Sequence, residues 1–299
     1  MPADKGNSEP LLSSEFMVRL DRLDLVSRKI LAGKLKGERR SKRHGQSVEF
    51  ADYRDYAVGD DLRFIDWNVY ARLERLFLKL FLEEEDLVLY VVLDISRSCD
   101  YGEPHKGLYM KRAAAALGYV GLVNYNRVCM CAMTGGTFRQ VGPMRGRTAI
   151  SRMLDFLGAL RCHGAGNLGE SCRRFALAHR QKGVCVVISD FFDKHGYEHG
   201  LRYLSSGRYD LFALHILSPQ EIDPQLEGDV RLRDLEDRSS AEMVITAEVL
   251  GQYRRNLAEL RDGLKQYVTR RGGVYIFAST DMPFENLVLN YLRERRLLG

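Results

Sequence analysis

Three short stretches of the sequence place aspartate or hydroxyl side chains where chemistry could take place. In "LYVVLDISRS", Asp94 ends an apolar run, and Ser96 and Ser98 follow at every second position. In "VCVVISD", Asp190 ends a second apolar run in the same way. In "MRGRTAIS", Thr148 follows a glycine-containing turn. Carboxylate and hydroxyl oxygens are ligands that hard divalent cations accept, so these five residues are the candidate ligands of a metal ion.

Asp94, Ser96 and Ser98 alone are compatible with several roles, because such a cluster can hold a phosphate, activate a nucleophile, bind a metal or cap the next helix. The second aspartate at a strand end, Asp190, and the Thr148 turn between the two favour the metal. We therefore predict a Mg²⁺ or Mn²⁺ site. Coordination rich in hydroxyl groups leaves the ion electron-poor, so we expect it to accept one further carboxylate from a partner protein.

The elements that must position these residues are strands that alternate with helices. Apolar runs of strand length lie at 87–93, 127–134, 184–189, 209–217 and 273–279, with a hairpin partner at 136–143. Helical segments are expected at 110–126, within 144–160 just after "GRT", and at 167–181, 197–206, about 248–271 and about 284–297. Continuous apolar strands separated by helices indicate a parallel sheet covered on both faces.

We therefore predict an α/β fold, with a doubly wound, mostly parallel six-stranded sheet and one antiparallel edge strand. In such sheets, ligands bind at the carboxyl ends of the strands where the strand order reverses. Asp94 and Asp190 meet there if their two strands are neighbours.

The chain before the sheet is expected to form a small subdomain rich in β-strands and helix. We predict a disordered tail over residues 1–12. Residues 13–86 then hold an amphipathic helix from Ser14, a basic connector and an aromatic and acidic block. Residues 87–299 form the α/β domain, with a hairpin insertion at about 229–246.

Composition places the chain among ordinary globular proteins. Hydrophobic residues make up 45% and charged residues 28% of the sequence. The longest apolar runs are shorter than a membrane span, and the polar N-terminus lacks the order of a secretory signal, so we expect a cytoplasmic protein. The six cysteines, with no C-x-x-C pair, are interpreted as reduced and mostly buried thiols. Two of them, Cys129 and Cys131, share one face of a strand, where cysteine usually acts as a small hydrophobic residue.

The net charge of +5 is unevenly distributed. The stretch "GKLKGERRSKRHG" is basic, and nucleic-acid binding through residues 34–43 is one interpretation. Three glycines within the stretch favour a solvated connector, and the acidic "EEED" lies nearby in the sequence. Nucleic acid is therefore not the expected partner.

Two motifs carry a resemblance to known families. "DISRS", "GRT" and "ISD" in this order resemble the metal-ion-dependent adhesion site of von Willebrand factor type A domains, whose ligands correspond to Asp94, Ser96, Ser98, Thr148 and Asp190. The block "GQSVEFADYRDYAVGDDLRFIDW" and the residues after it resemble the bacterial domain of unknown function 58 family, in which such a block precedes an A-type domain. Cys99 and the "SDFFD" segment depart from the common patterns, and Asp193 becomes a rival to Asp190.

The second resemblance implies a role that is not enzymatic. Members of that family are commonly associated with MoxR-type AAA+ ATPases and are thought to act as adaptors or assembly factors. The partner implied for this chain is therefore such an ATPase, its client, or both, and no small-molecule substrate is expected. The sequence contains no G-x-x-x-x-G-K-[ST] motif, so ATP-driven work would come from the partner.

The signature block has two interpretations. Its aromatic and charged residues either bind a partner, because Tyr, Trp and Arg are the usual anchors of interfaces, or fasten the subdomain to the A-type domain. The second interpretation is favoured, since the single tryptophan is large enough to be core. The candidate partner-binding residues are Tyr53, Arg54, Tyr56, Asp60, Asp61, Arg63, Asp66 and Trp67.

A magnesium-dependent phosphohydrolase with Asp94 as nucleophile is the enzymatic alternative. Phosphotransfer enzymes of the haloacid dehalogenase type place a second aspartate two residues later as acid–base. This sequence has Ser96 there, and serine transfers protons poorly. The enzymatic interpretation is therefore the weaker one.

Overall fold

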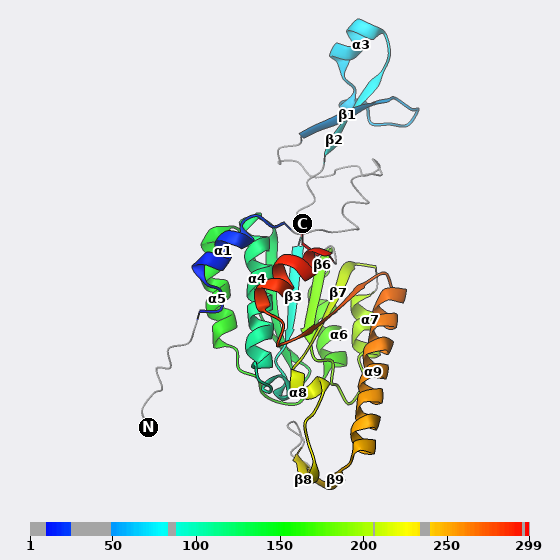
Figure 1. Ribbon diagram of the computed structural model, residues 1–299. Helices are drawn as coiled ribbons and strands as arrows, with labels where there is room; N and C mark the ends of the chain where they lie inside the picture. Colours follow the sequence, from blue (N-terminus) through cyan, green and yellow to red (C-terminus); the bar gives the residue numbers. More distant parts are fainter. Residues whose placement is uncertain are drawn as a thin grey trace. The chain divides into compact units, whose positions relative to one another are not determined.

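The computed structural model describes residues 10–24, 49–82, 88–205, 207–233, 240–294 and 297–298. The chain divides into two compact units (Figure 1). The larger unit contains residues 10–24 and the described residues from Val88 onward, and the smaller unit contains residues 49–82.

The larger unit is built on one six-stranded sheet. Its strands in chain order are β3 (Val88–Asp94), β4 (Arg127–Thr134), β5 (Thr137–Met144), β6 (Gly183–Ser189), β7 (Tyr209–Leu217) and β10 (Val274–Ser279). Their order across the sheet is β10-β7-β6-β3-β4-β5, and all neighbours are parallel except β4 and β5. In this doubly wound order the direction of winding reverses between β3 and β6. The predicted fold class is confirmed.

Helices cover both faces of the sheet (Figure 1). One face packs on α4 (Lys106–Val123), α5 (Ile150–Ala159) and the C-terminal segments α10 (Phe284–Asn286), η4 (Leu287–Tyr291) and α11 (Leu292–Glu294). The other packs on α6 (Leu168–Ala178), α7 (Glu198–Leu204) and α9 (Ala247–Arg270). Alternate residues of β3, such as Leu89 and Tyr90, enter opposite cores, so the strand is apolar throughout its buried length.

The N-terminal segment belongs to the larger unit. Helix α1 (Ser14–Leu20) begins at Ser13, whose hydroxyl accepts a hydrogen bond from the Phe16 N–H. Phe16 packs against Phe284, and Leu12 is buried. The predicted disorder is therefore wrong at Leu12, and α1 groups with the sheet rather than with the signature block. Residues 1–9, the basic connector and the "EEED" stretch lie outside the described residues.

The smaller unit is an antiparallel pair with a short helix between its strands. Strands β1 (Glu49–Asp55) and β2 (Phe77–Leu82) flank η1 (Leu62–Phe64) and α3 (Trp67–Leu73). The aromatic residues and β-formers of this block favour short strands and turns, so α3 was not predicted from the sequence. Asp66 begins this helix, because its carboxylate accepts hydrogen bonds from two backbone N–H groups of the first turn.

Further short elements complete the larger unit. They are η2 (Arg97–Cys99), η3 (Arg147–Ala149), α8 (Pro219–Ile222) and an antiparallel pair of strands, β8 (Gly228–Arg233) and β9 (Ser240–Ile245). This pair lies where the hairpin insertion is expected. Among the described residues, every helix is too short or too polar to cross a membrane.

Candidate metal centre

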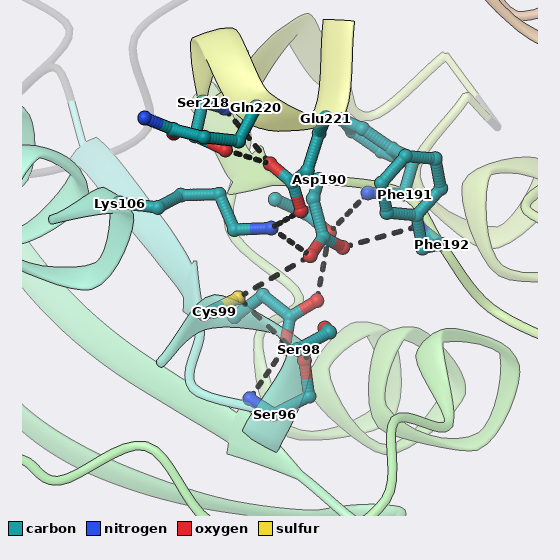
Figure 2. A network of polar contacts seen from close by, with 12 residues as sticks. Ser96, Ser98, Cys99, Lys106, Asp190, Phe191, Phe192, Ser218, Gln220 and Glu221 are labelled. Atoms are coloured by element: carbon teal, nitrogen blue, oxygen red, sulfur yellow. Dashed lines mark hydrogen bonds and ion pairs between the residues drawn. The ribbon is translucent and has the colours of Figure 1, made fainter. Parts of the chain in front are cut away.

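Asp94 and Asp190 converge at the point where the strand order reverses. Asp94 is the last residue of β3, Asp190 directly follows β6, and these strands are parallel neighbours. The Ser98 hydroxyl donates a hydrogen bond to Asp190 (Figure 2) and lies 3.0 Å from the Ser96 hydroxyl. Four of the five predicted ligands therefore lie together.

The loop after β3 is folded so that Asp94 faces this cluster. The Ser96 N–H donates to one Asp94 carboxylate oxygen at 2.8 Å, and the Ser189 hydroxyl donates to the other at 2.7 Å. The loop is also fixed to the segment before α6, because the Arg97 N–H donates to the Gly164 carbonyl at 2.9 Å. Both oxygens of Asp94 are thus oriented by groups of the chain itself.

A buried lysine lies on the other side of Asp190. The Lys106 ammonium, which is 0% exposed, lies 2.7 Å from Asp190 and 2.5 Å from Glu221 of α8 (Figure 2). The second Asp190 oxygen accepts a hydrogen bond from the Phe192 N–H at 3.1 Å. Lys106 therefore joins the first turn of α4, the end of β6 and α8 through charge-assisted hydrogen bonds.

The pKa values of Asp94 and Asp190 shift in opposite directions. Burial and the nearby charge of Asp190 raise the pKa of Asp94 to about 6. Burial also opposes ionisation of Asp190, but the Lys106 ammonium outweighs it and holds the pKa of Asp190 below its ordinary value. The pair thus has one firmly ionised carboxylate, Asp190, and one, Asp94, that pairs with no cation in the described part of the chain.

The structure separates Thr148 from the other predicted ligands. Thr148 lies in η3, which follows β5, and β5 is antiparallel: Met144 near its end pairs with Val128 at the start of β4. Asp94 instead pairs with Met133 near the end of β4. Thr148 is therefore at the opposite end of the sheet, and the prediction that it joins this site is wrong.

The loop that does reach the site is the one before α6. A pocket beside Asp94 is lined by Ser96, Thr134, Asn167 and Asp193 among other residues. Asn167 caps α6 by accepting a hydrogen bond from the Glu170 N–H. Asp193, the predicted rival of Asp190, accepts hydrogen bonds from the Leu168 N–H at 2.5 Å and the His195 N–H at 2.8 Å. Its two oxygens are therefore oriented by the chain as those of Asp94 are, on the same pocket.

Three residues near the two aspartates were not predicted. Lys106 and Glu221 are distant in sequence, and the Cys99 thiol lies 3.9 Å from Asp190 and 3.6 Å from the Ser96 hydroxyl. Burial raises the pKa of Cys99 well above its ordinary value, so it remains a neutral thiol. For Cys99, the signal in the sequence is its departure from the pattern of the family that the block resembles.

The chemistry of the four converging residues fits a divalent cation. Neighbouring oxygen ligands of octahedral Mg²⁺, at about 2.0–2.1 Å from the ion, lie about 2.9 Å apart. The Ser96 and Ser98 hydroxyl oxygens are hydrogen-bonded to each other at 3.0 Å, so they are close enough to bind the same ion. Burial and the Asp190 charge raise the pKa of Asp94, and a bound ion would offset both effects.

The predicted partner-binding residues lie in the smaller unit. Tyr53 and Asp66 are hydrogen-bonded at 2.9 Å, and Lys79 lies 3.0 Å from Asp66. Arg54 pairs with Asp60, Arg63 pairs with Asp61, and the Tyr56 N–H donates to the Leu76 carbonyl. Trp67 is 60% exposed, so it is not core within its own unit, contrary to the expectation from its size.

Comparison with known proteins finds relatives that match most of this chain. Uncharacterized proteins of Mycobacterium tuberculosis and Mycobacterium bovis are 26% identical over 279 residues, which is 92% of this chain and 88% of theirs. Among solved structures, the conserved hypothetical protein BatB from Bacteroides thetaiotaomicron covers 70% of this chain with 98% of its own, at 14% identity and a TM-score of 0.46. The SpRpn10 VWA domain gives a TM-score of 0.42 at 10% identity, over 69% of this chain and 94% of that domain.

The family comparison is more specific. Residues 52–263, more than half of the chain, match the family described as protein of unknown function DUF58. The match covers most of the signature block and the sheet as far as α9. The chain belongs to the DUF58 family.

Proposed function

We propose that the larger unit is a non-enzymatic protein-interaction module whose partner binding depends on a divalent cation. The observation that supports this most strongly is the convergence of Asp94 and Asp190 with the Ser96 and Ser98 hydroxyls at two neighbouring strand ends. Two carboxylates and two hydroxyls form a set that suits Mg²⁺ or Mn²⁺.

The chain's own groups would hold the ligands ready. Ser189 and the Ser96 N–H orient Asp94, while Lys106 and the Phe192 N–H orient Asp190. The ion, when bound, would supply an open coordination position for a carboxylate of a partner protein. The positive charge of Lys106 beside Asp190 lowers the affinity of the site for a cation. This favours reversible binding of the ion over permanent occupancy.

The partner we propose is a MoxR-type AAA+ ATPase or a client of it, with this chain as adaptor or assembly factor. Membership of the DUF58 family and the resemblance described above support this choice. The sequence has no P-loop motif, so ATP hydrolysis would be the work of the partner. The signature residues Tyr53 to Trp67 offer exposed aromatic and arginine side chains for a second contact.

Phosphoryl transfer through Asp94 is less well supported. Both Asp94 oxygens already accept hydrogen bonds, from Ser96 and Ser189. The position where an acid–base aspartate would lie is Ser96, whose side chain is buried against Ser98 and Cys99. These contacts favour a ligand role over a nucleophilic one.

Calorimetric titration of the full chain with Mn²⁺ or Mg²⁺ tests the site. We expect binding to wild type and its loss in the Asp94→Ala/Asp190→Ala double variant. Thr148→Ala is the matched control, because Thr148 is at the other end of the sheet and its removal should leave the affinity unchanged. Unchanged metal affinity in the double variant would refute the assignment.

The adaptor role needs a separate experiment. Purified MoxR-type ATPase should be retained by the immobilised full chain in Mg²⁺ and released by a chelator, and the double variant should fail to retain it. Retention that is equal with and without the metal would contradict metal-dependent binding even if the ion itself binds.

A further inference from the structure

A second cluster of potential metal ligands lies on the sheet face that α6 covers, away from the aspartate site. The Cys129 and Cys131 sulfurs of β4 are 3.8 Å apart, and the Cys131 sulfur is 3.9 Å from Nε2 of His179. The three ligand atoms all lie within 4.8 Å of one another. Both thiols are buried, and the histidine is partly exposed.

The fold holds these three side chains on rigid elements. Cys129 and Cys131 are two residues apart on one strand and therefore point to the same face. His179 is the C-cap residue of α6, and its ring packs against Tyr90 at 5.1 Å and Phe175 at 4.7 Å between centroids. The Tyr209 hydroxyl donates a hydrogen bond to the His179 carbonyl, which fixes the backbone as well.

We propose that Cys129, Cys131 and His179 form a zinc site, with Gln140 as the fourth ligand. In a tetrahedral site with Zn–S bonds of about 2.3 Å, the two sulfurs lie about 3.8 Å apart. The observed sulfur separation has that value.

Gln140 lies beside Cys131 and His179, on the solvent-exposed side of the cluster. It pairs directly with Cys131 across the β4–β5 ladder, and its Oε1 atom is 2.8 Å from Nε2 of His179. Gln140 is exposed, so an ion can enter from its side. For the metal to bind, the Nε2 proton must move to Nδ1, and the amide oxygen then turns from hydrogen-bond acceptor to ligand.

Charge favours zinc over the other soft cation that thiols select, Cu(I). Binding of Zn²⁺ to two thiols and a neutral imidazole releases two protons to the solvent and leaves an uncharged complex. Cu(I) with two thiolates would leave a buried negative charge, which is costly away from water. Burial lowers the pKa of His179, so its imidazole is neutral near pH 7 and has a lone pair to offer.

Competition between the reduced full chain and a chromogenic chelator measures the zinc affinity, with excess Mg²⁺ present to occupy the aspartate site. We expect one Zn²⁺ per chain. Cys131→Ala should lower the affinity by more than about a hundredfold, and Gln140→Leu by about tenfold. Cys172→Ala, which removes another buried thiol from the same core, should leave it unchanged.

Co²⁺ substitution gives a readout specific for sulfur ligands, the intense sulfur-to-cobalt absorption. This absorption should remain in Cys99→Ala, which removes the thiol beside Asp190. It should be absent in the double variant His179→Gln/Cys131→Ala. Retained secondary structure in the metal-free variants, measured by circular dichroism, confirms that loss of binding is not loss of folding. No zinc binding by the reduced protein, Cu(I) binding without zinc binding, or binding that persists in Cys131→Ala would overturn the proposal.

Discussion

Two ion pairs, one in each unit of this protein, differ in their exposure to water. In the larger unit, Lys106 is 0% exposed and contacts Asp190, whose side chain is 1% exposed. In the smaller unit, Arg75 pairs with Asp55 with the two side chains 66% and 65% exposed. The first pair is isolated from water, and the second is surrounded by it.

This difference decides what each pair does. Removing one partner of a buried ion pair costs about 3–5 kcal/mol, because the other charge is left without compensation. Exposed pairs contribute about 0–1 kcal/mol, since water and salt screen them. We therefore expect charge changes at the aspartate site to alter folding and cation binding, and changes in the exposed pairs to alter mainly what the surface can bind.

The largest expected effect is that of Lys106→Met. Loss of the ammonium leaves Asp190 and Glu221 facing each other in a buried site, so the free energy of unfolding should fall by about 3–5 kcal/mol. Urea unfolding at pH 7 without divalent metal measures it. Mn²⁺ should recover part of the loss, because the site has become more negative.

Lys111→Met on the same helix is the matched control. Lys111 donates to the Leu160 carbonyl and pairs with no carboxylate in the described contacts, so its loss should be smaller. Equal losses in the two variants would show that the Lys106 ion pairs contribute little.

The next largest effect is expected from the charge of Asp94, and it appears first as a pH dependence of the wild type. The folded-state pKa of about 6 lies above the ordinary 3.8, so the folded state holds the proton more tightly than the unfolded state. Stability of the metal-free wild type should therefore fall as pH rises from about 4 to about 6 and stay constant above.

Asp94→Asn should remove this pH dependence. It should also raise the free energy of unfolding of the metal-free protein at pH 7 by about 1–2 kcal/mol. The gain is limited because the hydrogen bonds from Ser96 and Ser189 are altered. Thermal unfolding across this pH range measures it. A variant less stable than wild type at pH 7 would argue against uncompensated charge at Asp94.

Asp66 in the smaller unit should titrate in the opposite sense. A hydrogen bond from Lys79, aided by those from Tyr53 and the first turn of α3, outweighs burial and lowers the pKa of Asp66 to about 2. Its stabilisation is present above about pH 4 and is lost as pH falls toward 2. Asp66→Asn should therefore weaken the smaller unit at pH 7 and flatten its acid transition, as followed by the fluorescence of Trp67. An unchanged acid transition would contradict this assignment.

The smallest effect is expected for Arg54→Ala. This arginine pairs with Asp60 at the surface, so its loss should change the free energy of unfolding by less than about 1 kcal/mol. If the signature block binds a partner, the same variant should weaken retention of the ATPase. A large loss of stability would show instead that the pair is structural.

The strands and the meeting of the two aspartates were predictable from the sequence. The strands Arg127–Thr134 and Tyr209–Leu217 match the predicted ranges, because buried parallel strands are continuous apolar runs with clear ends. Asp94 and Asp190 meet because a doubly wound sheet brings the strands at its reversal point together.

The errors have identifiable causes. Thr148 follows a strand that was itself predicted to be antiparallel, so the chain had to return to the opposite end of the sheet before reaching it. A residue pattern cannot show that Lys106, at the start of an alanine-rich helix, reaches Glu221 across 115 positions of sequence. The helix α3 was missed because its aromatic residues favour strands, whereas the Asp66 cap starts a helix.

The most direct test of a cation site between β3 and β6 is the anomalous difference map of crystals soaked in Mn²⁺. We predict a single strong peak at the aspartate site, within bonding distance of the Ser96 and Ser98 hydroxyls and beside the Asp94 and Asp190 carboxylates. A map with no peak there at saturating Mn²⁺, or with the only peak near Thr148, would contradict it.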